Sequence, residues 1–442
     1  MSAAGLIQVG PAPARSAESA IARERGAQRL VTAFILTGLA FLLLPGTFLG
    51  AWNLISISES HSLTTLSPAW IQAHGHAQVF GWIGTFILGI GLYSLQKMQR
   101  SAPFPLSRGW MLWGMWTSGV LLRWLTNIYE WHWRMLLPAS AVLEFVAFVL
   151  FYVSVRSHRR PDLKTKQEAW IKLVAASSIG FLLAMACNLA LAIWGAAYNS
   201  GSAISHAVDQ RFLVLATWGF VVLAIWGFNA KWLPVFIGLE APSDGGLIAA
   251  LIVNEAGVAC ALLGLLRTAT FLLLFGAVLS MLALHVFEPS ARPPKILNVH
   301  ATFPIFLRLA YVWLGVAAVL GVWAAGADRF GGIWGASRHA LTVGCCAAMV
   351  FAIGQRVLPA FCGMKILYSP ALMLWSLLLL NIGCLLRVAS EVPAYEGYWP
   401  RAWRILPISA VTELLAVSLF AFNIAMSILM PMRTARADDQ ST

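Results

Sequence analysis

The chain has 442 residues, of which 59% are hydrophobic and only 11% are charged, and its mean hydropathy is +0.76. This composition excludes an ordinary soluble domain and is typical of an integral membrane protein. The formal net charge of +12 requires no nucleic-acid partner, because clusters of Lys and Arg that face the cytoplasmic leaflet follow from membrane topology. The six cysteines form no C-x-x-C motif, so the sequence favours neither covalent c-type haem nor a zinc ribbon.

Hydrophobic stretches of membrane-span length recur along the whole chain. A helix that crosses the ~30 Å hydrocarbon core needs about 20 mostly apolar residues. Twelve stretches meet this length, and they lie at about 30–52, 70–97, 110–128, 138–155, 170–194, 207–233, 246–266, 269–287, 304–325, 338–358, 366–388 and 405–430. The sequence therefore predicts an all-α membrane protein with twelve transmembrane helices and with both termini on one side.

Basic residues are distributed unevenly between the predicted loops. The first 29 residues carry four arginines and lack the apolar core and cleavage site of a secretory signal, which predicts a basic cytoplasmic tail at 1–29. The loop 156–168 holds five Lys and Arg residues, whereas the loop 53–69 holds none. By the positive-inside rule, we expect an N-in, C-in topology with a second cytoplasmic tail at 431–442.

Short motifs repeat in the same order along the chain. Leu137-Pro-Ala-Ser-Ala-Val-Leu-Glu144 opens the fourth predicted helix, and Leu406-Pro-Ile-Ser-Ala-Val-Thr-Glu413 opens the last one, with six of eight positions identical. A weaker echo, Ala277-Val-Leu-Ser280, has serine in place of the carboxylate. Leu-Leu-Arg ends the third helix of each presumed unit, at Arg123, Arg267 and Arg387.

The second helices of the presumed units also resemble one another. His76-Ala77 is followed by glycines five and fifteen positions after the histidine, and His339-Ala340 is followed by glycines at the same offsets. His206-Ala207 lies in the corresponding region of the middle unit. These echoes predict a pseudo-threefold architecture, unlike the two six-helix halves of a major-facilitator transporter. The three predicted four-helix units lie at 30–156, 170–288 and 304–430.

Two histidines open the second predicted helix, in the stretch His74-Gly-His-Ala-Gln-Val-Phe-Gly-Trp82. An imidazole at a membrane helix end is costly unless it is paired, hydrated or bound to a metal. Neutral imidazole is also the usual protein ligand of haem iron and copper. We therefore interpret His76 and His339 as the leading candidate ligands of haem or a metal, with His74 and His206 as further metal ligands. The alternative interpretation is that these histidines cap helices or form hydrogen bonds across a helix interface.

Arginine and glutamate also occur within predicted membrane helices. Arg123 and Arg387 lie near the outer ends of their helices, where they can pair with carboxylates such as haem propionates or extend toward the surface. Glu144 and Glu413 lie inside the fourth and twelfth helices. A carboxylate in such a place predicts proton handling, metal ligation or an ion pair with a nearby arginine.

Taken together, these residues resemble the NnrS family of bacterial membrane proteins. The resemblance rests on the 74–82 stretch, on Arg338-His-Ala-Leu-Thr-Val-Gly344, and on Gln355-Arg-Val-Leu-Pro359 and Leu385-Leu-Arg-Val388. It implies a polytopic protein of the bacterial cytoplasmic (inner) membrane that contains haem and copper. It also implies an association with denitrification and with tolerance of nitric oxide and nitrosative stress.

The twelve predicted helices in three groups of four are also similar to subunit I of haem–copper oxidases and nitric oxide reductases. In that superfamily the second and tenth helices supply the low-spin haem ligands, and the matching positions are His76 (or His74) and His339. The present chain has no adjacent His-His pair in its seventh helix, and its tenth helix has one histidine rather than two. These differences argue against a binuclear oxygen-reducing centre.

The leading hypothesis is a protein that binds haem b, with copper as a second metal, and handles or senses nitric oxide or another small diatomic ligand. His76 and His339 would be the axial ligands, Arg123 and Arg387 would hold the propionates, and Glu144 and Glu413 would tune the site or relay protons. A respiratory-chain electron donor would be a further partner, alongside membrane lipid. The alternatives are a transporter or metal-trafficking channel that uses the same histidines and glutamates, and an assembly partner of a respiratory complex. Whether the protein turns over a substrate is left open by the sequence.

Overall fold

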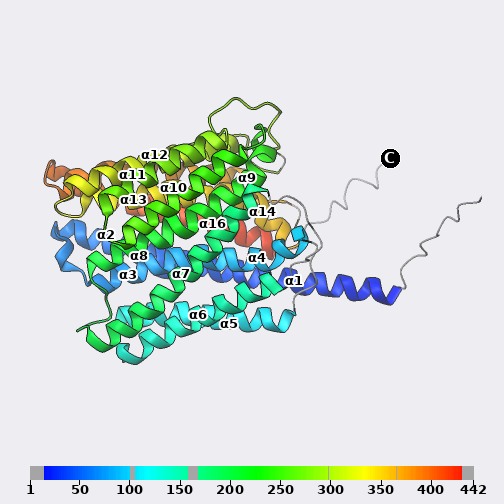
Figure 1. Cartoon of the computed structure of the whole chain (residues 1–442), viewed down its shortest axis with the longest axis horizontal. Coiled ribbons are helices and arrows are strands. Elements are labelled where there is room, and N and C mark those ends of the chain that lie inside the picture. The colour runs from blue at the N-terminus through cyan, green and yellow to red at the C-terminus, as the bar shows by residue number, and fades with distance from the viewer. Residues whose placement is uncertain (1–13, 100–104, 158–167, 297, 365, 431–442) are drawn as a thin grey trace, which may run out of the picture.

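The computed structural model describes residues 14–99, 105–157, 168–296, 298–364 and 366–430, and every regular element in these ranges is helical. Eleven of the helices are long and apolar enough to cross a membrane, and they run side by side along the long axis of the molecule (Figure 1). The chain is therefore a multi-pass helical membrane protein. A helix of 24 residues also occupies the predicted span at 110–128, but it is not among those eleven. The count of twelve, like the division into three units, stays a prediction.

The α-helices of the described ranges follow one another along the chain with short connections. In order, they are α1 (Ala14–Phe41), α2 (Leu49–Ser60), α3 (Pro68–His76), α4 (Thr85–Gln99), α5 (Leu106–Tyr129), α6 (Trp133–Ser157), α7 (Ala169–Tyr198), α8 (His206–Val214), α9 (Leu223–Ile237), α10 (Asp244–Leu262), α11 (Leu266–Ala283), α12 (Phe303–Ala327), α13 (Gly332–His339), α14 (Ala348–Phe361), α15 (Pro370–Tyr395) and α16 (Leu406–Leu429). Two short 3-10 turns, η2 (Leu63–Thr65) and η6 (Pro400–Arg404), lie between helices.

Four π-helical segments join consecutive α-helices into longer, continuous ones. They are η1 (Leu42–Phe48), η3 (Ala77–Gly84), η4 (Leu215–Val222) and η5 (Ala340–Ala347). Each has glycine at its fifth position: Gly46, Gly81, Gly219 and Gly344. Such segments are rare and are frequent at functional sites, because the wider turn re-aims the side chains around it.

The helices that contain π segments form the centre of the bundle. Segment η3 contacts both η1 and η4, and η4 contacts η5. In an apolar stretch of 18 residues from each span, the buried share is 83, 78 and 67% for the spans that contain η3, η4 and η5 and 61% for the span that contains η1. It is only 33–50% for the seven other spans. The other helices therefore form an outer layer, and the repeated histidine-containing helices lie inside it.

Two helix pairs of the outer layer show the same close contact. A Cβ atom at Gly119 of α5 would lie 2.8 Å from Cγ of Glu144 on α6, and one at Gly383 of α15 would lie 2.6 Å from Cγ of Glu413 on α16. Glycine therefore lets each pair approach closely enough to bury a glutamate between its helices. The sequence repeat around the two glutamates is thus matched by a repeated structure.

The middle of the chain departs from the predicted repeat. In the pair α10 and α11, a Cβ atom at Gly257 would lie 3.0 Å from Cγ of Leu273, just as Cβ atoms at the other two glycines would lie close to Cγ of glutamates. By this contact, Leu273 rather than Ser280 takes the place of the carboxylate. Segment η4 begins after Val214, whereas η3 and η5 begin directly after His76 and His339. The counterpart of those two histidines is therefore Val214 and not His206.

Arg267 and the N-terminal region also differ from expectation. Arg267 is the second residue of α11 and does not end the preceding helix; it is exposed and donates to the carbonyl of Ala325 at 3.3 Å. The predicted tail 1–29 is helical from Ala14 onward and continuous with the first span. Residues 1–13, the tail 431–442 and most of the basic loop 156–168 lie outside the described residues.

Candidate functional site

A cavity of about 1010 Å³ lies between the central helices. It is lined by residues of α2, α3, α8 and α13, which lie toward one end of the bundle in Figure 1, while α4, α9 and α14 lie toward the other. Seven of the eight predicted site residues line it: His74, His76, His206, His339, Arg123, Arg387 and Glu413. The eighth, Glu144, lies behind His76. The chain thus brings together residues that are more than 300 positions apart in the sequence.

The walls of the cavity divide into an apolar part and a polar part. The apolar lining comes largely from the π segments and their neighbours, and it includes Leu42, Val79, Phe80, Trp82, Trp218, Val221, Leu341, Val343, Ala347, Leu380 and Val417. The polar lining consists of the histidines, arginines and carboxylates near the helix ends. An apolar body with a few convergent polar groups is the usual form of a cofactor or ligand site.

His74 is held by contacts to the first long helix. Helix α3 begins at Pro68, a favoured first helical residue, and the hydroxyl of Ser67 accepts from the Ala69 N–H at 3.3 Å. The imidazole Nδ1 lies 2.9 Å from the carbonyl oxygen of Gly46 in η1. The ring packs directly on Gly50, where any Cβ atom would overlap it. Because the carbonyl can only accept, Nδ1 carries the proton and Nε2 keeps its lone pair.

His339 has the same arrangement on the other side of the cavity. Its Nδ1 lies 2.9 Å from the carbonyl oxygen of Gly335, one turn earlier in α13, and 3.2 Å from Oε2 of Glu391. The lone pair of Nε2 is again left for another partner. A proton on Nδ1 that is bonded to a carbonyl or carboxylate is the usual state of a histidine that binds metal through Nε2.

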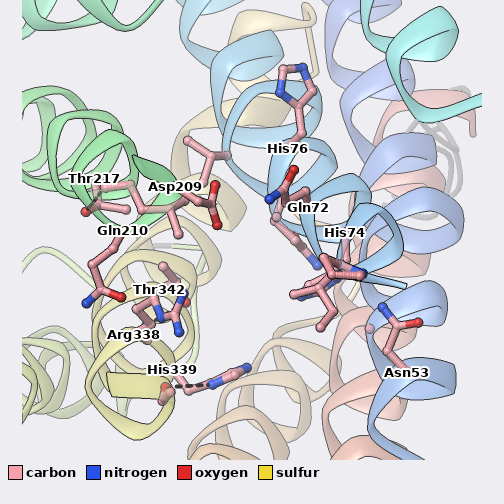
Figure 2. Close-up of a pocket in the computed structure, with 18 of the residues that line it drawn as sticks. Asn53, Gln72, His74, His76, Asp209, Gln210, Thr217, Arg338, His339 and Thr342 are labelled. Atoms are coloured by element: carbon pink, nitrogen blue, oxygen red, sulfur yellow. Dashed lines mark hydrogen bonds between the residues drawn. The ribbon is translucent and has the colours of Figure 1, made fainter. Parts of the chain in front are cut away.

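His76 is arranged differently, although it is only two residues from His74. Its ring points away from the ring of His74 (Figure 2), and its Nε2 lies 2.9 Å from Oε1 of Glu144. The other oxygen of Glu144 accepts from Nδ2 of Asn188 at 3.2 Å, and Oδ1 of Asn188 accepts from Nη1 of Arg123 at 3.4 Å. His76, Glu144, Asn188 and Arg123 therefore form one buried chain, which we call the first polar network.

A second polar network lies around His339. Nη2 of Arg387 donates to Oε1 of Glu391 at 3.0 Å, and Oε2 of the same carboxylate faces His339. Glu413 lies nearby and is half-buried, and its Oε1 is buried without a hydrogen-bond partner within the described residues. Nε and Nη1 of Arg387 are likewise buried without a partner there, as is Nε of Arg123. Buried groups in this state are costly unless a ligand or water satisfies them.

His206 and the loop before it lie at the rim. His206 is the first residue of α8 and is exposed. Nε2 of Gln72 donates to the carbonyl of Ile204 at 2.8 Å, and Oε1 of Gln72 accepts from the N–H of Ile204 at 3.0 Å. This pair fixes the loop 199–205 beside α3. In the ranges that the structure describes, no three His, Cys, Asp or Glu side chains gather into a metal-binding group.

Several residues of the site were missed by the sequence reasoning. Asn188, Glu391, Asp209 and Arg338 all line the cavity, and Figure 2 shows Asp209 and Arg338 across from His74. Only Glu391 had a local signal, because it follows Arg387 by four positions and residues at this spacing meet on a helix. The carbonyl partners of the two histidines have no sequence signal at all.

The fold and the cavity define a multi-pass helical membrane protein with imidazoles and arginines around a largely apolar cavity. The sequence matches the family model described as NnrS protein over residues 31–433. Because this match covers almost the whole chain, the protein belongs to the NnrS family. A comparison with curated proteins gave no match.

Proposed function

We propose that the protein binds haem b in this cavity, with His74 and His339 as the residues that would hold its iron. The observation that supports the proposal most strongly is the shared state of the two imidazoles. Each comes from a different central helix, each has Nδ1 engaged with a backbone carbonyl, and each has Nε2 available at the same cavity. The sequence alone favoured His76 over His74, but the ring of His76 points away from that of His74 (Figure 2), toward Glu144, which engages its Nε2.

The cavity suits a macrocycle with acidic side chains. Its volume of about 1010 Å³ is at the upper end of the ~300–1,000 Å³ typical of ligand sites. The apolar lining would contact the ring, and Trp82 on this lining has a buried indole N–H without a partner in the described part of the chain. The free N–H groups of Arg123 and Arg387 would pair with the propionates.

When bound, haem would supply one-electron chemistry and a site for a diatomic ligand such as nitric oxide. The residues of the chain would fix the ring, exclude water from it and hold charge near it. His74 and His339 would hold the iron, and a site held by two imidazoles favours electron transfer. The unpartnered carboxyl group of Glu413 would then hydrogen-bond within the cavity or exchange a proton there. We infer a role in nitric oxide handling on this basis, with a respiratory-chain component as electron donor.

The first test is the visible absorption spectrum of the full chain purified in detergent from a haem-replete bacterial host. We expect a Soret band and, after reduction with dithionite, the sharp α-band of a low-spin b-type haem. Nitric oxide added to the reduced protein should shift these bands. A colourless protein that stays colourless after haem is added would overturn the proposal.

Copper is implied by the family resemblance, but the described residues contain no ready group of three ligands for it. Metal analysis of the same sample tests it separately, since copper at a fixed ratio to protein would require a further site. We also propose that the protein lies in the bacterial inner membrane with both termini inside. The cavity would then face the periplasmic half of the membrane.

A further inference from the structure

Glu391 is a buried carboxylate at the meeting point of two candidate cofactor-binding side chains. It lies on α15 and is 2% exposed. Oε1 accepts from Nη2 of Arg387 at 3.0 Å, and Oε2 lies 3.2 Å from Nδ1 of His339. A single carboxylate thus contacts the candidate propionate partner and the proton-bearing nitrogen of the candidate axial ligand.

A glycine in α13 leaves space for this carboxylate. Gly335 faces Glu391, and a Cβ atom at residue 335 would overlap Oε1 of the glutamate. The carbonyl oxygen of Gly335 also accepts from Nδ1 of His339 at 2.9 Å. Glu391 and Gly335 together therefore contact Nδ1 of the His339 ring. The carboxylate can lie there only because residue 335 has no side chain.

The first polar network has no counterpart of this carboxylate. Glu391 follows Arg387 by four residues on α15, and the residue four positions after Arg123 on α5 is Asn127. Asn127 donates to the carbonyl of Ala69 at 3.3 Å and does not contact His76. Of the two polar networks at the cavity, only that of His339 thus has, among the described residues, a negative charge beside an imidazole Nδ1.

We propose that Glu391 is a positioning residue that orients His339 and makes its Nε2 a stronger donor to the bound iron. This inference rests on the proposed function. The negative charge of the carboxylate, whose Oε2 lies 3.2 Å from Nδ1 beside the hydrogen bond from Nδ1–H to the Gly335 carbonyl, raises the basicity of the imidazole and would stabilise the more positive, oxidised iron. Glu391 would thus set the haem midpoint potential low, and it would also hold Arg387 ready for a propionate.

The test is a spectroelectrochemical titration of haem-loaded wild type, E391Q, E391D and G335A in detergent. Removal of the charge in E391Q should raise the midpoint potential, so that the reduced-to-oxidised ratio at a fixed potential rises by about tenfold, or ~59 mV for one electron. E391D keeps the charge and should lie closer to wild type. G335A keeps every charge but displaces the carboxylate, so it should shift the potential in the same direction as E391Q.

The matched control is E130Q, which removes an equal charge from a cavity-lining residue that contacts Ser202 and no histidine. It should change the potential much less than E391Q does. If E391Q and G335A bind haem with wild-type potentials, or if E130Q shifts the potential as much, the inference about Glu391 is wrong while the proposed function stands. If E391Q is isolated without haem, the midpoint potentials of E391D and G335A test the inference in its place. A wild-type protein without haem would overturn the proposed function and this inference together.

Discussion

His76 and Glu144 form a closed buried pair, with Nε2 of the histidine 2.9 Å from Oε1 of the glutamate. His339 and Glu413 hold the corresponding positions in the last part of the chain, yet they form no such pair, because His339 turns to Glu391 instead. The two repeats of one motif thus have different chemistry. In the first, both oxygens of the glutamate are paired, whereas in the second Oε1 of Glu413 is left without a partner in the described part of the chain.

The first polar network should contribute strongly to stability. Glu144→Ala removes the carboxylate that contacts both His76 and Asn188, and it leaves Nε2 of His76 and Nδ2 of Asn188 buried without their acceptor. A buried polar group left unsatisfied costs about 1–3 kcal/mol. We expect a loss of this size in the free energy of unfolding, measured by denaturant titration in detergent. In the double variant E144A/R123A the loss should be clearly smaller than the sum of the single losses; simple additivity would show that the two groups are not coupled.

Two glycines of α5 provide a matched test of the close α5–α6 contact. Gly119→Ala would place a Cβ atom 2.8 Å from Cγ of Glu144, whereas Gly114 has nothing within 4 Å of the same position. Overpacking of this kind costs about 1–3 kcal/mol, while alanine in an uncrowded helix site gains about 0.5–1 kcal/mol over glycine. Thermal unfolding should therefore show a lower midpoint for G119A and an equal or higher one for G114A. Equal midpoints for the two variants would mean that the helices do not approach so closely.

A carboxyl pair outside the membrane spans should make stability depend on pH. Asp328 accepts from two N–H groups at the start of α13, and Glu396 accepts from the neighbouring N–H groups of residues 329 and 330. Burial, together with the nearby carboxyl group of Asp328, raises the pKa of Glu396 above the ordinary value of 4.5. A raised pKa in the folded state means that the protonated form stabilises the fold at low pH.

This contribution is fully present below pH 4.5 and is lost as the pH rises through the raised pKa of Glu396. We therefore expect the unfolding temperature of the wild type to fall over that interval relative to that of E396Q, which cannot ionise there. A profile of E396Q that is parallel to the wild type would contradict the assignment.

Cysteine labelling in intact cells tests the proposed orientation. The continuous helix from His206 to Ile237 separates the loop that contains Ser200 from the loop that contains Ala241, so the two loops lie at opposite ends of the bundle. With the termini inside, a membrane-impermeant maleimide should label S200C from the periplasm and should label A241C only after the cells are broken. The wild type gives the background from the six native cysteines. The reverse pattern would place the cavity at the cytoplasmic side.

The sequence predicted the helical class, and it named seven side chains that the structure places around one cavity, because both depend on strong local signals. Membrane spans follow from apolar length, and the motif ending in Glu144 recurs at Glu413 with the same packing against a glycine. The middle region misled the comparison, since His206 lies at the rim of the same cavity but does not directly precede a π segment, and the residue directly before η4 is Val214. A chance His-Ala pair cannot be told from a true repeat without the position of the π segment.

The choice between His74 and His76 also lay beyond the sequence. Which imidazole nitrogen is free depends on Gly46 for one residue and on Glu144 for the other, and both partners come from distant helices. A spacing of two residues gives the rings opposite directions, but it does not say which ring faces the cavity. Glu391 alone could have been found from the sequence, through its spacing from Arg387.

The most direct test of the haem proposal is the haem content of three single variants, H74A, H339A and H76A, measured as the α-band of the reduced protein per folded polypeptide. We predict that H74A and H339A lose the low-spin signal and that H76A, which removes a neighbouring imidazole already engaged by Glu144, keeps most of it. Folding is checked by the elution profile and the helical circular dichroism of each variant. If H76A lost the haem while H74A kept it, the central claim would be contradicted.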